Sequence, residues 1–170
     1  QRTLDSALAS KTVDDLFEFV LQRVEGDFGR GVVCDSMTAI WASRSGLLEK
    51  EILSIAGLSP ASWAAIRHSL DDGLQEINGR ITFAHEHLRT AVADRYLGRK
   101  ADITAAHQKL ARWFGQESSR ARRAEEEAWQ LRAAGDAAGL LKCLGSHDRF
   151  MAMYEHRGTE EIANFWLGIE

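Results

Sequence analysis

Two histidines flank one glutamate in His85-Glu86-His87, and their residue types suggest a binding site. Imidazoles and carboxylates bind zinc, but the zinc-protease pattern places its two histidines one helical turn apart. His85 and His87 are two positions apart and would point to different faces of a helix. We therefore expect no metal site here. Two other roles stay open, a structural histidine that caps a helix and a hydrogen-bond donor to a phosphate.

No other group of residues in the sequence indicates catalysis. The chain has no G-x-x-x-x-G-K-[ST] loop for nucleotide phosphates, and Gly29-Arg30-Gly31 is too short and lacks the lysine. It has no apolar strand ending in paired acids for magnesium and no nucleophile elbow. Cys34 and Cys143 lie far apart in apolar surroundings and are predicted to be reduced, buried thiols. We expect this segment alone to be no enzyme and to hold no cofactor.

Composition narrows the class of partner. The 170 residues carry a net charge of -4, which gives no basic surface for nucleic acid. No stretch reaches the roughly 18–20 apolar residues of a membrane span, and no signal peptide is recognisable. We therefore expect a cytoplasmic protein that binds neither nucleic acid nor membrane. Because the chain starts at Gln1 instead of methionine, we expect it to be an excised piece of a longer protein.

Helical periodicity dominates the first half of the chain, which contains a single proline. Thr12 is a predicted helix cap, and Ser59-Pro60 has a capping serine followed by proline at the first helical position. Four short helices are predicted, over about 13–24, 32–41, 48–56 and 60–72. Asn78-Gly79 then separates two short apolar segments, which is the strongest short-range signal for a β-hairpin. Short helices followed by a hairpin outline a winged helix.

The rest of the chain is predicted to be helical, in short helices that resemble the start of a TPR-like solenoid. We place a lead-in at 1–11, a winged-helix domain at 12–98 and a helical domain at 99–170, with a mainly α fold class. The mixed charges of 120–127 are typical of a solvated helix face. Apolar spacing predicts that all five tryptophans pack in the core: Trp41, Trp63, Trp113, Trp129 and Trp166.

Four segments resemble the region that follows the ATPase core in STAND proteins, the signal-transduction NTPases that include NACHT and NB-ARC proteins. These segments are 16–29, 40–47, 51–53 and, most sharply, 81–92. The last is similar to the family's strand-to-helix junction, where a histidine follows the wing and opens the next helix. The subgroup that the chain resembles most is that of NACHT proteins related to telomerase-associated protein, whose winged helix leads into TPR-like or WD40 repeats.

This resemblance implies a regulatory role. In such proteins the winged helix packs on the nucleotide-binding domain, and the histidine matched by His85 reaches the β-phosphate of ADP. Exchange for ATP releases this contact, and the protein oligomerises. Here Ala84 and Glu86 replace the methionine and aspartate of the better-known form, so the sensor is His85 or His87, with His85 favoured and Arg89 as a second candidate. The implied partners are an upstream NACHT-type domain, a C-terminal repeat domain and further copies of the intact protein, with ADP or ATP as its nucleotide.

Two alternatives come from other classes of function. The first is a DNA-binding winged helix, in which Arg67 and His68 on the helix of 60–72 would face the DNA. Asp71 and Asp72 at the end of that helix would repel the phosphates, which weighs against it. The second is a non-enzymatic helical scaffold or adaptor, which fits the second half of the chain but does not explain the Asn78-Gly79 hairpin.

Overall fold

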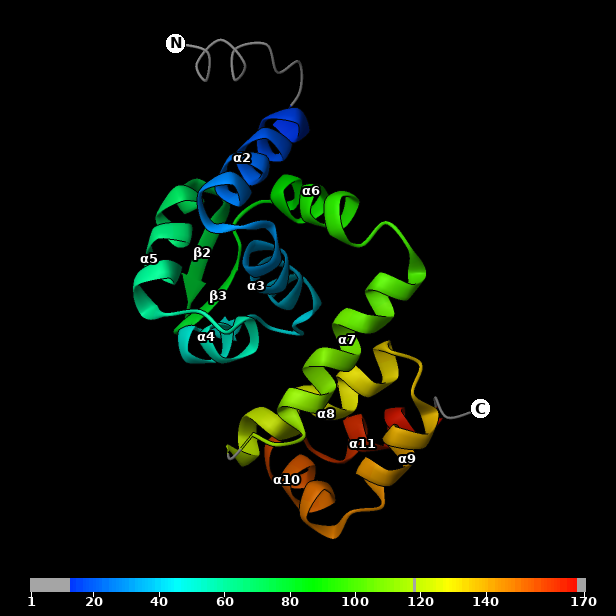
Figure 1. Cartoon of the computed structure of the whole chain (residues 1–170). Coiled ribbons are helices and arrows are strands. Elements are labelled where there is room, and N and C mark those ends of the chain that lie inside the picture. The colour runs from blue at the N-terminus through cyan, green and yellow to red at the C-terminus, as the bar shows by residue number, and fades with distance from the viewer. Residues whose placement is uncertain (1–12, 118, 168–170) are drawn as a thin grey trace, which may run out of the picture. The chain divides into compact units, whose positions relative to one another are not determined.

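The computed structural model describes residues 13–117 and 119–167, which form two compact units (Figure 1). The first unit contains the described residues up to Trp41 together with Ser45–Gly98. The second contains Ala42–Arg44 together with the described residues from Arg99 onward. The expected lead-in and the predicted cap at Thr12 lie outside the described residues.

Helices make up most of the described chain, which confirms the prediction of a mainly α fold with one β-hairpin and a helical array. The first unit has helices before, between and after three short strands. Its helices are α2 (Val13–Phe28), α3 (Arg30–Ala42), α4 (Glu49–Ala56), α5 (Pro60–Ser69), the 3-10 helix η1 (Asp71–Gly73) and α6 (Glu86–Tyr96). Its strands are β1 (Leu47–Leu48), β2 (Leu74–Ile77) and β3 (Arg80–Phe83).

The sheet of the first unit is antiparallel, in the order β1-β3-β2. The hairpin of β2 and β3 turns at Asn78 and Gly79, whose φ angles of 52° and 78° are those of the tight turn that Asn-Gly favours. Strand β1 pairs Leu47 with Ile81 and was not predicted, because two residues are too few to show a period. Helices α3, α4 and α5, with β1 between α3 and α4, are followed by the hairpin and form a winged-helix arrangement with it.

The core of the first unit lies between its helices and the sheet. Ser59 accepts a hydrogen bond from the Ser62 N–H, which confirms the predicted cap of α5. Trp63 is buried, as predicted, and so are its neighbours Ile66 and Leu70. The core also contains large side chains from the other α-helices and from the three strands of the unit, including Leu21, Met37, Ile40, Leu47, Ile52, Leu74, Ile81, Phe83, Leu88 and Val92.

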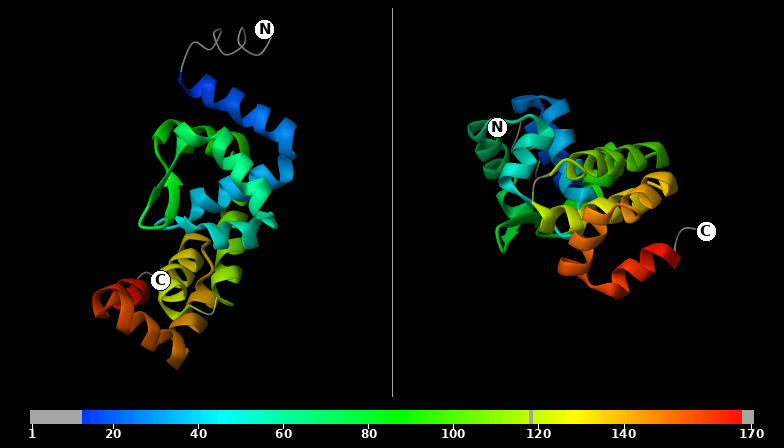
Figure 2. Two further views of the ribbon diagram at one scale, coloured as in Figure 1. Left: turned by 90° about the vertical axis from the view of Figure 1, so that its left-hand side faces the viewer. Right: turned by 90° about the horizontal axis from the view of Figure 1, so that it is seen from below.

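The second unit is an array of five described helices, shown from two further sides in Figure 2. They are α7 (Lys100–Phe114), α8 (Arg120–Ala133), α9 (Ala137–Leu144), α10 (His147–Arg157) and α11 (Thr159–Leu167). Helix α8 packs against α7, α9 and α10, and α11 packs against α10. Their shared core contains Ala124, Ala128, Leu140, Cys143, Leu144, Ala152, Met153, Ile162 and Phe165.

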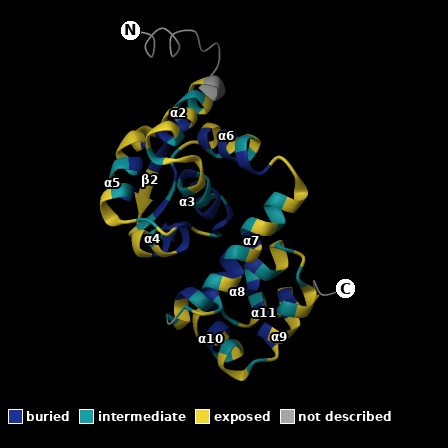
Figure 3. Ribbon diagram, in the orientation of Figure 1, coloured by how far each residue is buried: buried dark blue, intermediate teal, exposed yellow. Residues whose placement is uncertain are grey.

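Three expectations about side chains need correction. The charged run in α8 is not a solvated face, because Arg122, Glu126 and Glu127 are buried (Figure 3). These charges pair with one another and with neighbouring helices, which is what makes their burial tolerable. Trp166 is 46% exposed, so not every tryptophan belongs to the core. Neither cysteine forms a disulfide, but only Cys143 is buried.

None of the described helices combines the length and the apolar character that crossing a membrane requires.

Candidate functional site

The junction between β3 and α6 carries the histidines that the sequence singles out. The Ala84 N–H donates to the Gly73 carbonyl at 2.9 Å, and the Gln75 side-chain amide donates to the Phe83 carbonyl at 3.1 Å. Both hydrogen bonds join the end of β3 to the start of the hairpin. The backbone on either side of the junction is therefore held in place before α6 begins.

His85 occupies the cap position of α6 in an extended backbone conformation. Its side chain is exposed and makes no capping hydrogen bond, so the interpretation of this imidazole as a helix cap is wrong. His87, in the first turn of α6, is also exposed. The unpaired N–H groups and positive dipole end of a helix N-terminus favour a negatively charged partner. The imidazole of His85 is in a position to add a hydrogen-bond donor to that end.

Arg89 lies one helical turn beyond His85 on α6. Its guanidinium stands over the Trp41 ring, 5.1 Å from the centroid, and its Nε atom is 3.8 Å from a carboxylate oxygen of Glu86. Stacking on an aromatic ring restrains the planar guanidinium without using its N–H groups. Arg89 is thus oriented by Trp41 and still partly exposed, which suits a second contact to an anion.

An ion-pair network holds α6 against α2. The Arg95 Nε–H donates to Glu25 at 2.8 Å, the Tyr96 hydroxyl donates to the same carboxylate at 2.6 Å, and Arg95 also pairs with Glu18. The hydrogen bond from Arg95 lowers the pKa of the Glu25 carboxyl, with a smaller effect from Tyr96, although burial opposes both. The Glu25 carboxylate therefore stays ionised and anchors the end of α6 opposite to His85.

The helix that would read DNA has few charges to offer to phosphates. The Arg67 guanidinium donates to Glu76 at 2.9 Å and lies 3.8 Å from Glu49, so two carboxylates already neutralise it. Asp71 and Asp72, which the sequence placed at the end of this helix, lie in η1 just after it and are exposed. This arrangement does not favour a nucleic-acid interface on α5.

The second unit contains a buried polar network that was not predicted from the sequence. The Glu126 carboxylate, fully buried, accepts from the Arg44 backbone N–H at 3.2 Å and from the Gln130 amide at 2.9 Å. The same Gln130 amide donates to the Ala42 carbonyl, and the Gln130 oxygen lies 2.8 Å from His107 Nδ1. Because an amide oxygen can only accept, His107 carries a proton on Nδ1.

Burial raises the pKa of the Glu126 carboxyl, while the Gln130 hydrogen bond and the Arg122 charge oppose that rise. A signal for this network exists in the sequence: Arg122, Glu126 and Gln130 recur every four residues and so share one face of α8. Ala124 and Ala128 lie on another face of the same helix, in the core of the second unit.

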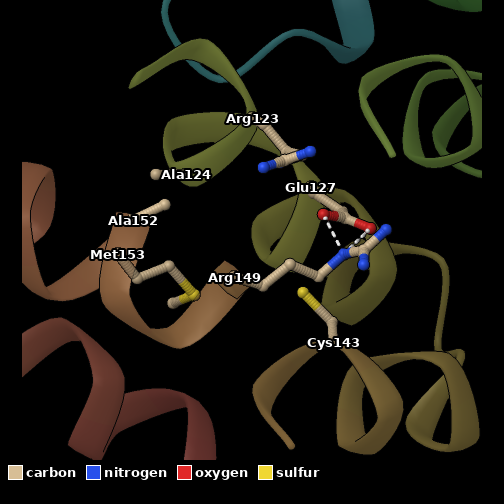
Figure 4. A pocket seen from close by; sticks show the side chains of 7 residues that line it. All are labelled: Arg123, Ala124, Glu127, Cys143, Arg149, Ala152 and Met153. Atoms are coloured by element: carbon tan, nitrogen blue, oxygen red, sulfur yellow. Dashed lines mark hydrogen bonds and ion pairs between the residues drawn. The ribbon is translucent and has the colours of Figure 1, made fainter. Parts of the chain in front are cut away.

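A narrow crevice beside Cys143 is another place in the second unit where charged and nucleophilic side chains lie close together (Figure 4). Arg149 Nε lies 2.8 and 2.9 Å from the two Glu127 oxygens, and Cys143 lies beside this pair. Burial, reinforced by the Glu127 charge, raises the pKa of the Cys143 thiol to about 12. A thiol with that pKa is protonated at neutral pH and is a poor nucleophile. No cluster of three or more potential metal ligands occurs within residues 13–117 and 119–167.

Comparison with known proteins relates the chain to part of larger ones. A TPR repeat-containing protein of Dictyostelium discoideum is 25% identical over 175 residues, an alignment that covers 98% of this chain and 10% of that protein. Tetratricopeptide repeat protein 41 of Rattus norvegicus is 24% identical over 172 residues (76% of this chain, 13% of that protein). The putative human tetratricopeptide repeat protein 41 is 26% identical over 183 residues, with 82% and 14% covered.

The chain is therefore a distant homologue of a region of TPR repeat-containing proteins. It spans only 10–14% of the length of these relatives, which contain much besides the matching region. No family model matches the chain, and no solved structure matches it significantly.

Proposed function

We propose that this chain is the regulatory region of a STAND-type signalling ATPase. In this proposal it couples the nucleotide state of a preceding NACHT-type domain to a C-terminal sensor array, and it acts in the cytoplasm. The observation that carries the proposal is the exposed His85 at the N-terminus of α6, one turn from an Arg89 that is oriented by Trp41. The chain itself performs no catalysis and holds no cofactor; the nucleotide belongs to the intact protein.

The chemistry of the switch follows from these groups. The His85 imidazole donates to the β-phosphate of ADP in the partner domain, and the N-terminus of α6 adds its dipole. Arg89 supplies a second positive charge. Exchange of ADP for ATP releases this contact, and the winged helix leaves the nucleotide-binding domain. The intact protein then self-associates.

The relatives support the coupling role indirectly. Since the matching region is 10–14% of their length, they have room for other domains besides it. Their names record TPR repeats, which accords with a repeat array as the C-terminal partner.

The test uses the full-length protein with His85→Ala and, as a matched control, His87→Ala. Both side chains are exposed and two positions apart, so the two changes affect the local charge in the same way. We expect His85→Ala to purify with less bound ADP and to self-associate without a stimulus, while His87→Ala behaves as the parent protein. Equal ADP content in all three proteins would refute the role of His85, and loss with His87→Ala alone would assign it to His87.

A non-enzymatic scaffold is the second candidate. The stacked helices α7–α11 and the homology to TPR repeat-containing proteins favour it. It predicts that self-association and partner binding do not depend on nucleotide, so the same experiment separates the two functions.

A further inference from the structure

A cavity of about 300 Å³ in the second unit gathers three arginines. Arg132 comes from the end of α8, Arg157 from the end of α10, and Arg44 from the Ala42–Arg44 segment of the same unit. The cavity is completed by residues of α11, namely Glu160, Glu161, Asn164 and Phe165. Three guanidinium groups face two carboxylates, so the lining carries one excess positive charge.

Glu161 already engages two of the arginines. The Arg157 Nε–H donates to it at 2.9 Å, and both terminal nitrogens of Arg44 contact its two oxygens. Burial acts to raise the pKa of the Glu161 carboxyl, but the hydrogen bonds of Arg44 and Arg157 outweigh it and the pKa is lowered. The cavity therefore binds a carboxylate of the chain itself, which shows the chemistry that its arginines accept.

Arg132 is the arginine without such a partner. Its guanidinium stands over the ring of the buried Phe165, 4.8 Å from the centroid, and it forms no ion pair within the part of the chain that the structure describes. Aromatic stacking orients the guanidinium plane and leaves its N–H edge available. A preoriented guanidinium edge matches the two oxygens of a carboxylate.

We propose that this cavity binds a carboxylate-bearing ligand through Arg132, next to the internal carboxylate of Glu161. A carboxylate carries a single negative charge and so neutralises the excess charge of the lining. A phosphate dianion would leave the lining with a net negative charge. The proposal does not depend on the nucleotide-sensing role, because the cavity and α6 belong to different units.

The experiment is an NMR titration of the 170-residue chain with sodium acetate at constant ionic strength, followed at the arginine Nε–H signals. Arg112, on the exposed side of α7, is the internal reference, because it carries the same group outside the cavity. We expect the Arg132 signal to move and saturate while the Arg112 signal does not. A titration with inorganic phosphate tests the ligand class.

Two variants, with one control, test whether Arg132 binds the carboxylate; one should weaken binding and the other should strengthen it. Arg132→Gln should weaken acetate binding at least threefold, read at the Arg157 signal, whereas Arg112→Gln should not change it. Glu161→Gln should strengthen it at least threefold, because it frees Arg44 and Arg157. Arg132 is exposed, so its replacement should leave the fold intact. Equal shifts at Arg132 and Arg112, equal affinity in Arg132→Gln and the parent chain, or tighter binding of phosphate than of acetate would each overturn the proposal.

Discussion

Two histidines in this chain show opposite uses of the same side chain. His85, in the first unit, is exposed at the start of α6 and makes no capping hydrogen bond. His107, in the second unit, is 6% exposed, bonds to Gln130 and packs edge-on against Trp129 with ring centroids 5.5 Å apart. The imidazole of His107 stabilises the fold through these contacts, whereas the imidazole of His85 contributes little to stability. An exposed histidine such as His85 is therefore the better candidate for contacting a bound ligand.

The largest loss of stability is expected at Gln130, which lies at the centre of the buried polar network of the second unit. Gln130→Ala removes a fully buried amide and, with it, the hydrogen bonds that this amide makes with His107, Glu126 and the Ala42 carbonyl. Since an unsatisfied buried polar group costs about 1–3 kcal/mol, we expect the free energy of unfolding to fall by about 3 kcal/mol. Urea unfolding measures this. Gln108→Ala, at an exposed position of α7, is the control and should change it by less than about 0.5 kcal/mol.

Substitutions in the sheet of the first unit, the unit that carries His85, should reduce stability almost as much, although substitution of His85 itself should not. Gly46 precedes β1 with φ at +82°, and a Cβ atom there would lie 2.8 Å from the Ile81 carbonyl oxygen. Gly46→Ala combines this backbone clash with a strained φ, so we expect a loss of about 2–3 kcal/mol. Gly29→Ala shares the positive φ of +91° but meets no atom within 4 Å, and it should lose only about 1 kcal/mol. Equal losses in thermal unfolding would contradict the register of β1 and β3.

Loss of the Glu25 carboxylate, which holds α6 against α2, should have a smaller effect on stability, and this effect should depend on pH. Glu25→Gln replaces the ionised partner of Arg95, and hydrogen bonds to charged groups contribute about 1.5–3 kcal/mol, so we expect a loss of about 2 kcal/mol at pH 7. Because the folded pKa of Glu25 is lowered, this stability is present above the ordinary carboxyl pKa near 4.5 and is lost as the pH falls through the lowered value.

Urea unfolding of the parent chain and Glu25→Gln, repeated from pH 7 to pH 3, measures the difference between them. The two curves should converge towards the acid end of that range. A constant difference across the range would show that the Glu25 charge is not what stabilises the contact between α2 and α6.

The smallest expected effect on stability is at His85. Its exposed side chain makes no capping hydrogen bond, so His85→Ala should change the free energy of unfolding by less than about 0.5 kcal/mol. His107→Ala is the matched histidine and should lose about 2 kcal/mol, because it leaves the buried Gln130 oxygen without a donor. Thermal unfolding of both variants tests the comparison directly, and similar losses would remove the distinction between the two histidines.

Local signals made most of the first unit predictable. Ser59-Pro60 and Asn78-Gly79 each act through the conformation of their own residues, so the cap of α5 and the hairpin followed from the sequence alone. The two-residue strand β1 did not follow, because its only support is the distant pairing of Leu47 with Ile81.

Burial of charge was not predictable in the same way. The residues of 120–127 have the composition of a solvated helix face, and only the packing of α8 against its neighbours buries Glu126 and Arg122. The exposure of His85 was equally invisible, because a histidine at a helix start is compatible with a capping bond or with none. The sequence did single out His85, because this residue lies at the strand-to-helix junction.

The measurement that tests the proposed switch most directly is the rate of ADP dissociation from the full-length protein with and without His85→Ala. A hydrogen bond to a charged phosphate contributes about 1.5–3 kcal/mol, which corresponds to roughly a tenfold to hundredfold change in affinity. We predict that ADP leaves the His85→Ala protein at least tenfold faster, while His87→Ala releases it at the parent rate. An unchanged rate in His85→Ala would contradict the account.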